Sequence, residues 1–164
     1  MWTTEITEVA PDSPDAVTII GELDEHLMAN PYPPQSRHAY SVDKLLRERV
    51  VFFLTWHEGQ LAGCGGIKMI GTDYGEVKRM FVRPEFRGKG LGKLMLRHLA
   101  TYVVRQGANV LRLETGIHQV EAIGLYERWG FQRRGPFGEY VEDPNSIYFE
   151  KSIARRETNE DARP

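Results

Sequence analysis

Three glycines alternate with other residues at the point where a strand pattern gives way to a helix pattern. They are Gly88, Gly90 and Gly92 in the segment Arg87-Gly88-Lys89-Gly90-Leu91-Gly92-Lys93. Glycine lets backbone N–H groups approach an anion, and the dipole of the following helix favours negative charge at the same place. The segment therefore predicts a phosphate-binding turn. A glycine-rich loop that only caps a helix is the alternative interpretation.

Two better-known phosphate-binding motifs do not match this segment. A P-loop requires Gly-Lys followed by Ser or Thr, and the dinucleotide fingerprint requires the spacing G-x-G-x-x-G. The chain has Gly88-x-Gly90-x-Gly92 followed by Lys93 instead. Both classes of nucleotide site are thereby excluded.

The size and charge of the chain narrow the choice of partner. With 164 residues, the chain is long enough for one domain with a substantial core, which we expect to cover residues 1–153, followed by a polar tail, residues 154–164. The formal net charge of −2 does not favour nucleic acid, because basic residues cluster only around the glycine turn. A small phosphate-bearing ligand accounts for that cluster equally well.

The sequence contains no signal for export, membrane insertion or metal binding. No apolar run approaches ~18 residues, and the first residues lack a basic and apolar signal region. The single cysteine, Cys64, lies in an apolar strand pattern and fits core packing in a reducing compartment. No spacing of histidine and cysteine indicates a metal site. We therefore expect a cytoplasmic protein that binds neither membranes nor metals.

The order of strand and helix patterns predicts an α/β (α+β) fold. Strands up to residue 82 follow one another as antiparallel neighbours, whereas an intervening helix makes the strands at 76–82 and 109–115 parallel if the crossover has the usual right hand. The predicted strands are 4–10, 50–56, 61–70, 76–82, 109–115, 131–134 and 146–153, and the predicted helices are 14–29, 36–49, 91–105 and 122–129.

Two short signatures in this order resemble those of the GNAT family of N-acetyltransferases. The first is Arg87-x-x-Gly90-x-Gly92, which follows the strand Met80-Phe81-Val82, and the second is Leu125-Tyr126 followed by Gly130-Phe131. The resemblance covers about residues 50–153 and looks strongest for small bacterial members. It implies a mixed, mostly antiparallel central sheet that splays between two parallel strands and is flanked by helices.

The resemblance also implies acetyl-coenzyme A as the co-substrate. Backbone groups of β-strand residues would bind its pantetheine arm, and N–H groups of the glycine turn would bind its pyrophosphate. Arg87 would fix the turn or reach a phosphate, and Lys89 and Lys93 would meet the 3′-phosphate or only water. Gln119 stands where the family often has asparagine, so its contact with the cofactor is in doubt. The implied cofactor-binding residues are Met80, Phe81, Val82, Arg87, Gly88, Lys89, Gly90, Gly92, Lys93 and Gln119.

Acetyl transfer to an amine needs a base and an acid. Tyr126 occupies the position where the family often places the tyrosine that protonates the departing thiolate. Glu76 falls where several members carry the catalytic base, and Glu114 and His118 are rival candidates. Strand alternation supports Glu76, because it places that residue on the same face as Met80, whose N–H would polarise the thioester carbonyl.

The acceptor and the activity are less closely defined. We expect Glu114 and two residues of a proline-stiffened bend, Ser36 and His38, to bind a small-molecule amine. The leading prediction is transfer of acetyl to a primary amine by direct attack in a ternary complex. A regulatory module that binds coenzyme A without efficient transfer and a protein-modifying acetyltransferase are the alternatives, and a homodimer is left open.

Overall fold

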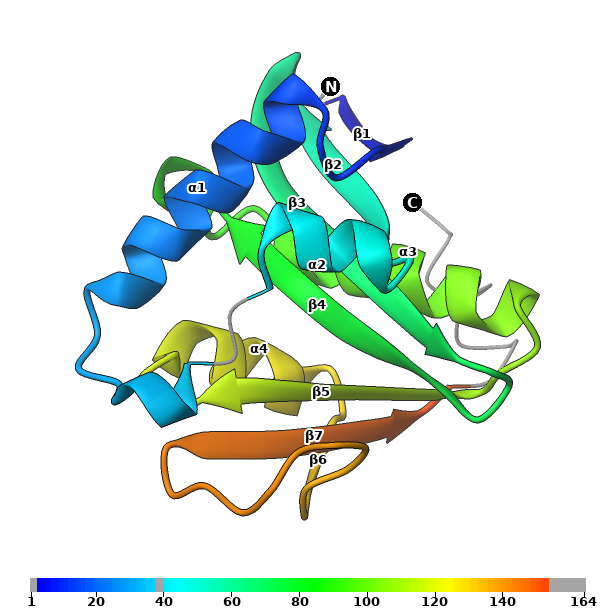
Figure 1. Ribbon diagram of the computed structural model, residues 1–164. Coiled ribbons are helices and arrows are strands. Elements are labelled where there is room, and N and C mark those ends of the chain that lie inside the picture. Colours follow the sequence, from blue (N-terminus) through cyan, green and yellow to red (C-terminus); the bar gives the residue numbers. More distant parts are fainter. Residues whose placement is uncertain (1–2, 38–39, 154–164) are drawn as a thin grey trace.

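The computed structural model describes residues 3–37 and 40–153 and contains a seven-stranded sheet of order β1-β2-β3-β4-β5-β7-β6 (Figure 1). The strands are β1 (Thr4–Val9), β2 (Val51–His57), β3 (Gln60–Ile70), β4 (Tyr74–Val82), β5 (Val110–Gly116), β6 (Gln132–Arg134) and β7 (Ser146–Ser152). The helices are α1 (Pro14–Met28), α2 (Val42–Arg47), α3 (Leu91–Arg105) and α4 (Val120–Arg128), with two 3₁₀ turns, η1 (Pro34–Ser36) and η2 (Pro84–Phe86).

The sheet confirms the predicted fold class. β4 and β5 run parallel, and the other neighbouring strands are antiparallel. The helix predicted for 36–49 was wrong in its bounds, because Ser36 belongs to η1 and α2 spans only Val42–Arg47. Ser41 sets that start, since its Oγ accepts a hydrogen bond from the Lys44 N–H at 3.2 Å.

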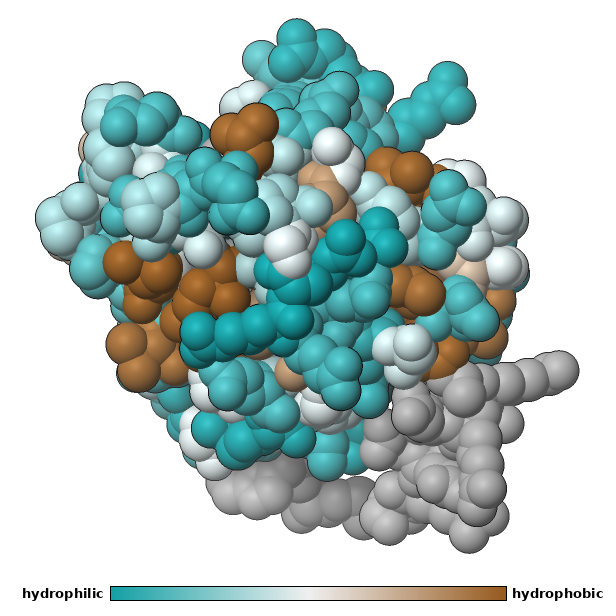
Figure 2. All heavy atoms as spheres, turned by 90° about the horizontal axis from the view of Figure 1, so that it is seen from below, coloured by the Kyte–Doolittle hydropathy of each residue, from teal (hydrophilic) through white to brown (hydrophobic). Residues whose placement is uncertain are grey.

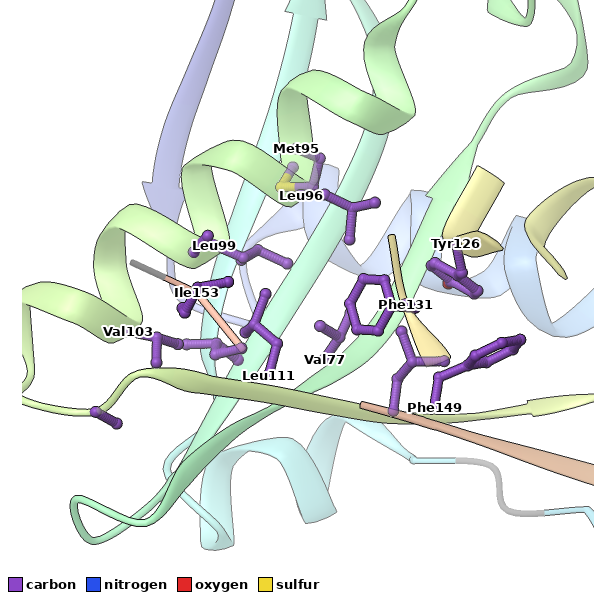
Figure 3. Packing of buried hydrophobic residues seen from close by; sticks show 14 of the residues in the cluster. Val77, Met95, Leu96, Leu99, Val103, Leu111, Tyr126, Phe131, Phe149 and Ile153 are labelled. Atoms are coloured by element: carbon purple, nitrogen blue, oxygen red, sulfur yellow. The ribbon is translucent and has the colours of Figure 1, made fainter. Parts of the chain in front are cut away.

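The helices divide between the two faces of the sheet (Figure 1). α1 and α2 cover one face and bury Ile19, Leu23 and Leu45 against β2 and β3. α3 and α4 cover the other face. Figure 3 shows this second cluster, in which Leu99 and Val103 of α3 point toward Leu111 of β5. The amphipathic spacing in the α3 sequence thus becomes a packed interface.

A bulge interrupts β4 at Arg79. Cys64 pairs with Phe81 and Gly66 pairs with Lys78, so β4 has one residue more than β3 between these pairs. Arg79 has a φ of 53°, and its backbone carbonyl accepts a hydrogen bond from the Cys64 Sγ at 3.2 Å. Such a bulge shifts the alternation of side chains along the strand.

The shift overturns the expectation that Glu76 and Met80 share a face. Val77 and Met80 belong to the cluster beneath α3, whereas Arg79 reaches Asp24 of α1 and Phe81 packs in the cluster beneath α1. Glu76 therefore lies on the face of α1 and α2. Simple alternation was wrong because it assumed an unbroken strand.

Truncation of a core residue should test the packing of α3. Leu99 is 0% exposed and Val17 of α1 is 47% exposed. Leu99→Ala should lower the free energy of unfolding by about 2–5 kcal/mol, because it leaves a cavity. Urea titration should show Val17→Ala, the control, within about 0.5 kcal/mol of the parent. A loss of the same size in both variants would contradict this packing.

Candidate active site

A cleft opens where β4 and β5 separate. The two strands pair at Gly75–Leu111 and Glu76–Arg112 and then diverge (Figure 1). A cavity of about 1000 Å³ lies between them and is also lined by α3 and α4. Among the described residues, the β5-facing edge of β4 beyond Glu76 has no strand partner. This free edge, which includes Met80 and Val82, can accept an extended amide-bearing chain as an added strand would.

The glycine turn forms one end of this cavity. Gly88 and Gly90 have φ values of 79° and 77°, which side chains rarely tolerate. Within the part of the chain that the structure describes, the N–H groups of Gly90, Leu91, Gly92 and Lys93 have no backbone acceptor. They lie at the start of α3, where the helix dipole favours an anion. The turn thus has the conformation and the donors that a pyrophosphate needs.

The polar side chains around the turn differ in their roles. Arg87 donates to the Val82 carbonyl at 3.3 Å and pairs with Glu121 of α4 at 2.7 Å, so in this structure it ties the turn to α4. Lys93 and Phe81 line the cavity, and Lys89 lies outside the lining residues. Gln119 also lines it, and its buried Nε2 has no hydrogen-bond partner within residues 3–37 and 40–153. Such an orphaned amide suits a cofactor contact, so the residues fit coenzyme A.

Tyr126 of α4 also lines the cavity. The residue is 6% exposed, and its ring packs on Phe131 and Phe149 (Figure 3). Burial raises the pKa of its hydroxyl, and the charge of Glu114 raises it further. Tyr126 is therefore protonated at neutral pH and can donate a proton into the cavity.

Glu76 belongs to a closed polar network. Its Oε2 lies 2.5 Å from the Lys78 Nζ and accepts a hydrogen bond from the Tyr140 hydroxyl at 2.7 Å. The Lys78 Nζ also donates to the Tyr140 hydroxyl at 2.8 Å and lies 4.0 Å from the centre of the Tyr40 ring. Lys78, Tyr40 and Tyr140 line the cavity, but Glu76 does not. Both charges are thus buried and mutually neutralised.

Glu114 is the second carboxylate of the site and is hardly paired. It lines the cavity, and its hydrogen bond comes from the Ser146 hydroxyl at a long 3.5 Å. Burial raises the pKa of Glu114 to about 7, with Lys78 opposing and Glu76 adding to the rise. A carboxyl with this pKa can take up or release a proton near neutral pH.

The other two predicted acceptor residues, Ser36 and His38, and the third candidate base, His118, differ in where they lie. Ser36 is buried, does not line the cavity, and its Oγ accepts a hydrogen bond from the Asn145 Nδ2 at 3.2 Å. His118 lines the cavity, and its backbone N–H donates to the Tyr32 hydroxyl at 2.8 Å. His38 lies outside the described residues.

The lining residues that were not predicted to belong to the site include Tyr40, Lys78 and Tyr140. Strand alternation places Lys78 on the same face as Glu76, but no role was predicted for it. Tyr40 and Tyr140 come from loops that no sequence pattern connects to β4. Among the described residues, no group of three or more His, Cys, Asp or Glu side chains could hold a metal ion.

Comparison with known proteins decides the family. The model of the acetyltransferase (GNAT) family matches residues 20–131, which include both β4 and the glycine turn. The chain belongs to the GNAT family. The chain therefore has an acyl-CoA-dependent acetyltransferase fold, and the splayed strands, the amide donors at the start of α3 and the free edge of β4 form its candidate site for coenzyme A.

Several relatives resemble this GNAT protein over nearly its whole length. An IAA acetyltransferase of Azospirillum brasilense is 41% identical over 150 residues, which are 88% of this chain and 97% of the relative. The solved structure of an acyl-CoA N-acyltransferase from Klebsiella pneumoniae is 34% identical, with a TM-score of 0.77 and coverage of 94% of this chain and 99% of that chain. The PaiA N-acetyltransferase of Thermoplasma acidophilum, solved in complex with coenzyme A, has a TM-score of 0.73 at 21% identity and covers 92% of this chain and 99% of that chain.

Substitution of Gly90 should test the cradle of this GNAT protein. Gly90→Glu adds a carboxylate where the pyrophosphate would bind and should abolish acetyl-CoA binding in calorimetry. Gly59 of the β2–β3 turn has the same φ of 77° and, like Gly90, has open space where a side chain would begin. Gly59→Glu is therefore a matched control, because it shares the backbone strain and leaves the site intact. Equal affinity of the two variants would refute the cradle.

Proposed function

We propose that this protein transfers an acetyl group from acetyl-CoA to a primary amine of a small molecule, by direct attack of the amine in a ternary complex. The observation that carries the proposal is that Glu114 and Tyr126 line the same cavity as the glycine turn. A candidate proton acceptor, a candidate proton donor and a candidate cofactor cradle thus line one cleft, as this reaction requires.

Two hydrogen bonds across one end of the cleft, here called the rim, favour a small molecule rather than a protein as the acceptor. The Tyr32 hydroxyl is bonded to the backbone of His118, and Ser36 is bonded to Asn145. These two contacts hold the segment around η1 against the β5–α4 turn and the β6–β7 loop, so this end of the cleft is bridged. An extended peptide would have to break such contacts in order to cross it.

The exposed apolar residues near this rim give the acceptor an apolar approach. Met28 at the end of α1, together with Ile117 and Val120 at the start of α4, is exposed. Figure 2 shows the face of the molecule seen from below, where apolar residues gather mainly at the left among hydrophilic ones. An amine with an apolar body suits these surroundings.

Two of the chain's residues have proton-transfer roles in this proposal. Acetyl-CoA, when bound, supplies the acetyl group as a thioester. An ammonium ion has no lone pair, so Glu114 accepts its proton and leaves the neutral amine as nucleophile. The Met80 N–H polarises the thioester carbonyl. Tyr126 then donates its hydroxyl proton to the departing thiolate and regains a proton from the acylated nitrogen, which leaves the neutral amide and the free thiol.

Glu114 has better support as the base than Glu76. The Glu76 carboxylate already holds Lys78 and Tyr140 and does not line the cavity, whereas the Glu114 carboxylate lines it with one long hydrogen bond. The role of Glu76 as the catalytic base stays a prediction from the family resemblance. The backbone bulge at Arg79 removes the alternation argument that had favoured it.

A regulatory module that binds coenzyme A without transfer is the competing function. Release of thiol from acetyl-CoA upon addition of a panel of amines separates the two. Amine-dependent thiol release, with the acetylated amine found by mass spectrometry, is the expected result. Acetyl-CoA binding without release for any amine would favour the module.

Replacement of Tyr126 by phenylalanine should affect turnover rather than cofactor binding. Tyr126→Phe removes the proton donor, so kcat should fall by roughly 10²-fold while the affinity for acetyl-CoA stays nearly the same. Tyr102 of α3 does not line the cavity and also packs at the edge of the α3 cluster. Tyr102→Phe is the control and should keep the parent kcat. An unchanged kcat in Tyr126→Phe, with chemistry limiting the rate, would reduce Tyr126 to a packing residue.

The pH profile should separate the two carboxylates. Because the pKa of Glu114 is raised to about 7, this base is protonated below that pH, and kcat/KM should rise through about pH 7. Glu114→Gln should lower kcat/KM near neutral pH and remove this rise, and Glu76→Gln should keep it. The same amine is used for all variants, and thermal melts verify folding. A rise kept in Glu114→Gln but lost in Glu76→Gln would restore Glu76 as the base.

A further inference from the structure

The two sides of the cleft differ in whether their positively charged side chains are paired with carboxylates. Lys93 of α3 and Arg128 of α4 line the cavity and form no ion pair with any described residue. They lie on the side of the sheet covered by α3 and α4, which also carries the glycine turn. Unpaired cations thus accompany the end of the cavity that fits a phosphate-rich ligand.

The opposite side has cations that are already neutralised. Lys78 and Arg79 are the lysine and arginine that line the cavity from β4, and their side chains are 7% and 5% exposed. Lys78 is paired with Glu76, and Arg79 is paired with Asp24. Lys78 is held further by the Tyr140 hydroxyl and the Tyr40 ring. To bind an anionic group, either cation would have to give up an existing partner.

The same side has one carboxylate without a cation. Glu114 forms no ion pair in the described part of the chain. Its negative charge favours a cation on this side. His26 and His118 also line the cavity.

We propose that the acceptor is a cationic amine with no carboxylate beside its reacting nitrogen, that is, an arylalkylamine or alkylamine rather than an α-amino acid. This inference rests on the proposed acetyl transfer. A substrate carboxylate would lie near Glu114 without an unpaired lysine or arginine to receive it, and like charges in such a site are strongly disfavoured. Discrimination comes from this repulsion as much as from attraction of the amine.

Matched pairs of acceptors test the charge requirement. Tyramine and tryptamine are compared with tyrosine and tryptophan at pH 8.5 by the rate of thiol release. Each amine should exceed its amino acid in kcat/KM by at least about tenfold. Tyrosine methyl ester and tryptophan methyl ester, which keep most of the added size but lack the negative charge, should recover most of the rate. Equal or faster acetylation of the amino acids overturns the inference and leaves acetyl transfer standing.

Two further outcomes have equally definite meanings. Rejection of the esters together with the acids would overturn the charge argument in favour of size. Absence of thiol release for a wider panel of amines and amino acids would remove the proposed function, and this inference would fall with it.

Removal of the carboxylate that neutralises Arg79 or Lys78 should shift the substrate preference toward the amino acid. Asp24→Asn removes the carboxylate that neutralises Arg79, and Glu76→Gln does the same for Lys78. Each should raise the ratio of kcat/KM for tyrosine to that for tyramine, by about tenfold. The ratio cancels any general loss of activity, and thermal melts with acetyl-CoA affinity verify the fold.

Glu22 supplies the matched control. It pairs with Arg83 at 2.7 Å, and Arg83 does not line the cavity. Glu22→Gln therefore removes a comparable carboxylate from α1 and should leave the ratio unchanged. A ratio that stays constant in folded Asp24→Asn and Glu76→Gln variants, or that rises equally in Glu22→Gln, would overturn the inference.

Discussion

The separation of β4 from β5 is the constraint on which the site depends. After Gly75–Leu111 and Glu76–Arg112, the two strands no longer pair, so one edge of β4 is left without its ladder partner. Unpaired backbone groups inside a protein are costly unless a ligand or water satisfies them. The sheet tolerates this cost because α3 and the cluster around Leu99 hold β4 and β5 together from one face. Core packing thus permits the incomplete strand pair, and the incomplete pair leaves an edge of β4 at which a ligand can bind.

The hydrogen-bond and ion-pair partners of each buried carboxylate decide its chemical role in the site. Glu76 and Glu114 lie on the same face, and only Glu76 has a lysine and a tyrosine hydroxyl within hydrogen-bond distance. A fully satisfied network is rigid, and its charges are expensive to separate. An unpaired buried carboxyl instead has a raised pKa and changes protonation easily. The Lys78–Tyr140–Glu76 network therefore forms a fixed wall beside a carboxyl that is free to exchange protons.

Local patterns in the sequence predicted the sheet, which the structure confirms, and the glycine turn, which forms one end of the cavity. Hydrophobic period, turn glycines and one crossover helix were sufficient for strand order around β4 and β5. The acceptor end depended on features without a local signature. The bulge at Arg79 altered which face Glu76 occupies, and Tyr140 reaches Lys78 from 62 residues away along the chain. Loop residues that meet only in the folded state leave no periodic trace in the sequence.

The two signatures are specific together because they touch. Arg87 of the first pairs with Glu121 at the start of α4, 2.7 Å away. A Cβ added to Gly92 would lie 2.7 Å from the Leu125 Cδ2 of the second, so a larger residue at position 92 would force the Leu125 side chain to move. This close contact between α3 and α4 puts the hydroxyl-bearing Tyr126 beside the cavity end formed by the turn. A short glycine motif alone indicates only a helix start, whereas its contact with the leucine-tyrosine helix places the turn and Tyr126 in the lining of one cavity.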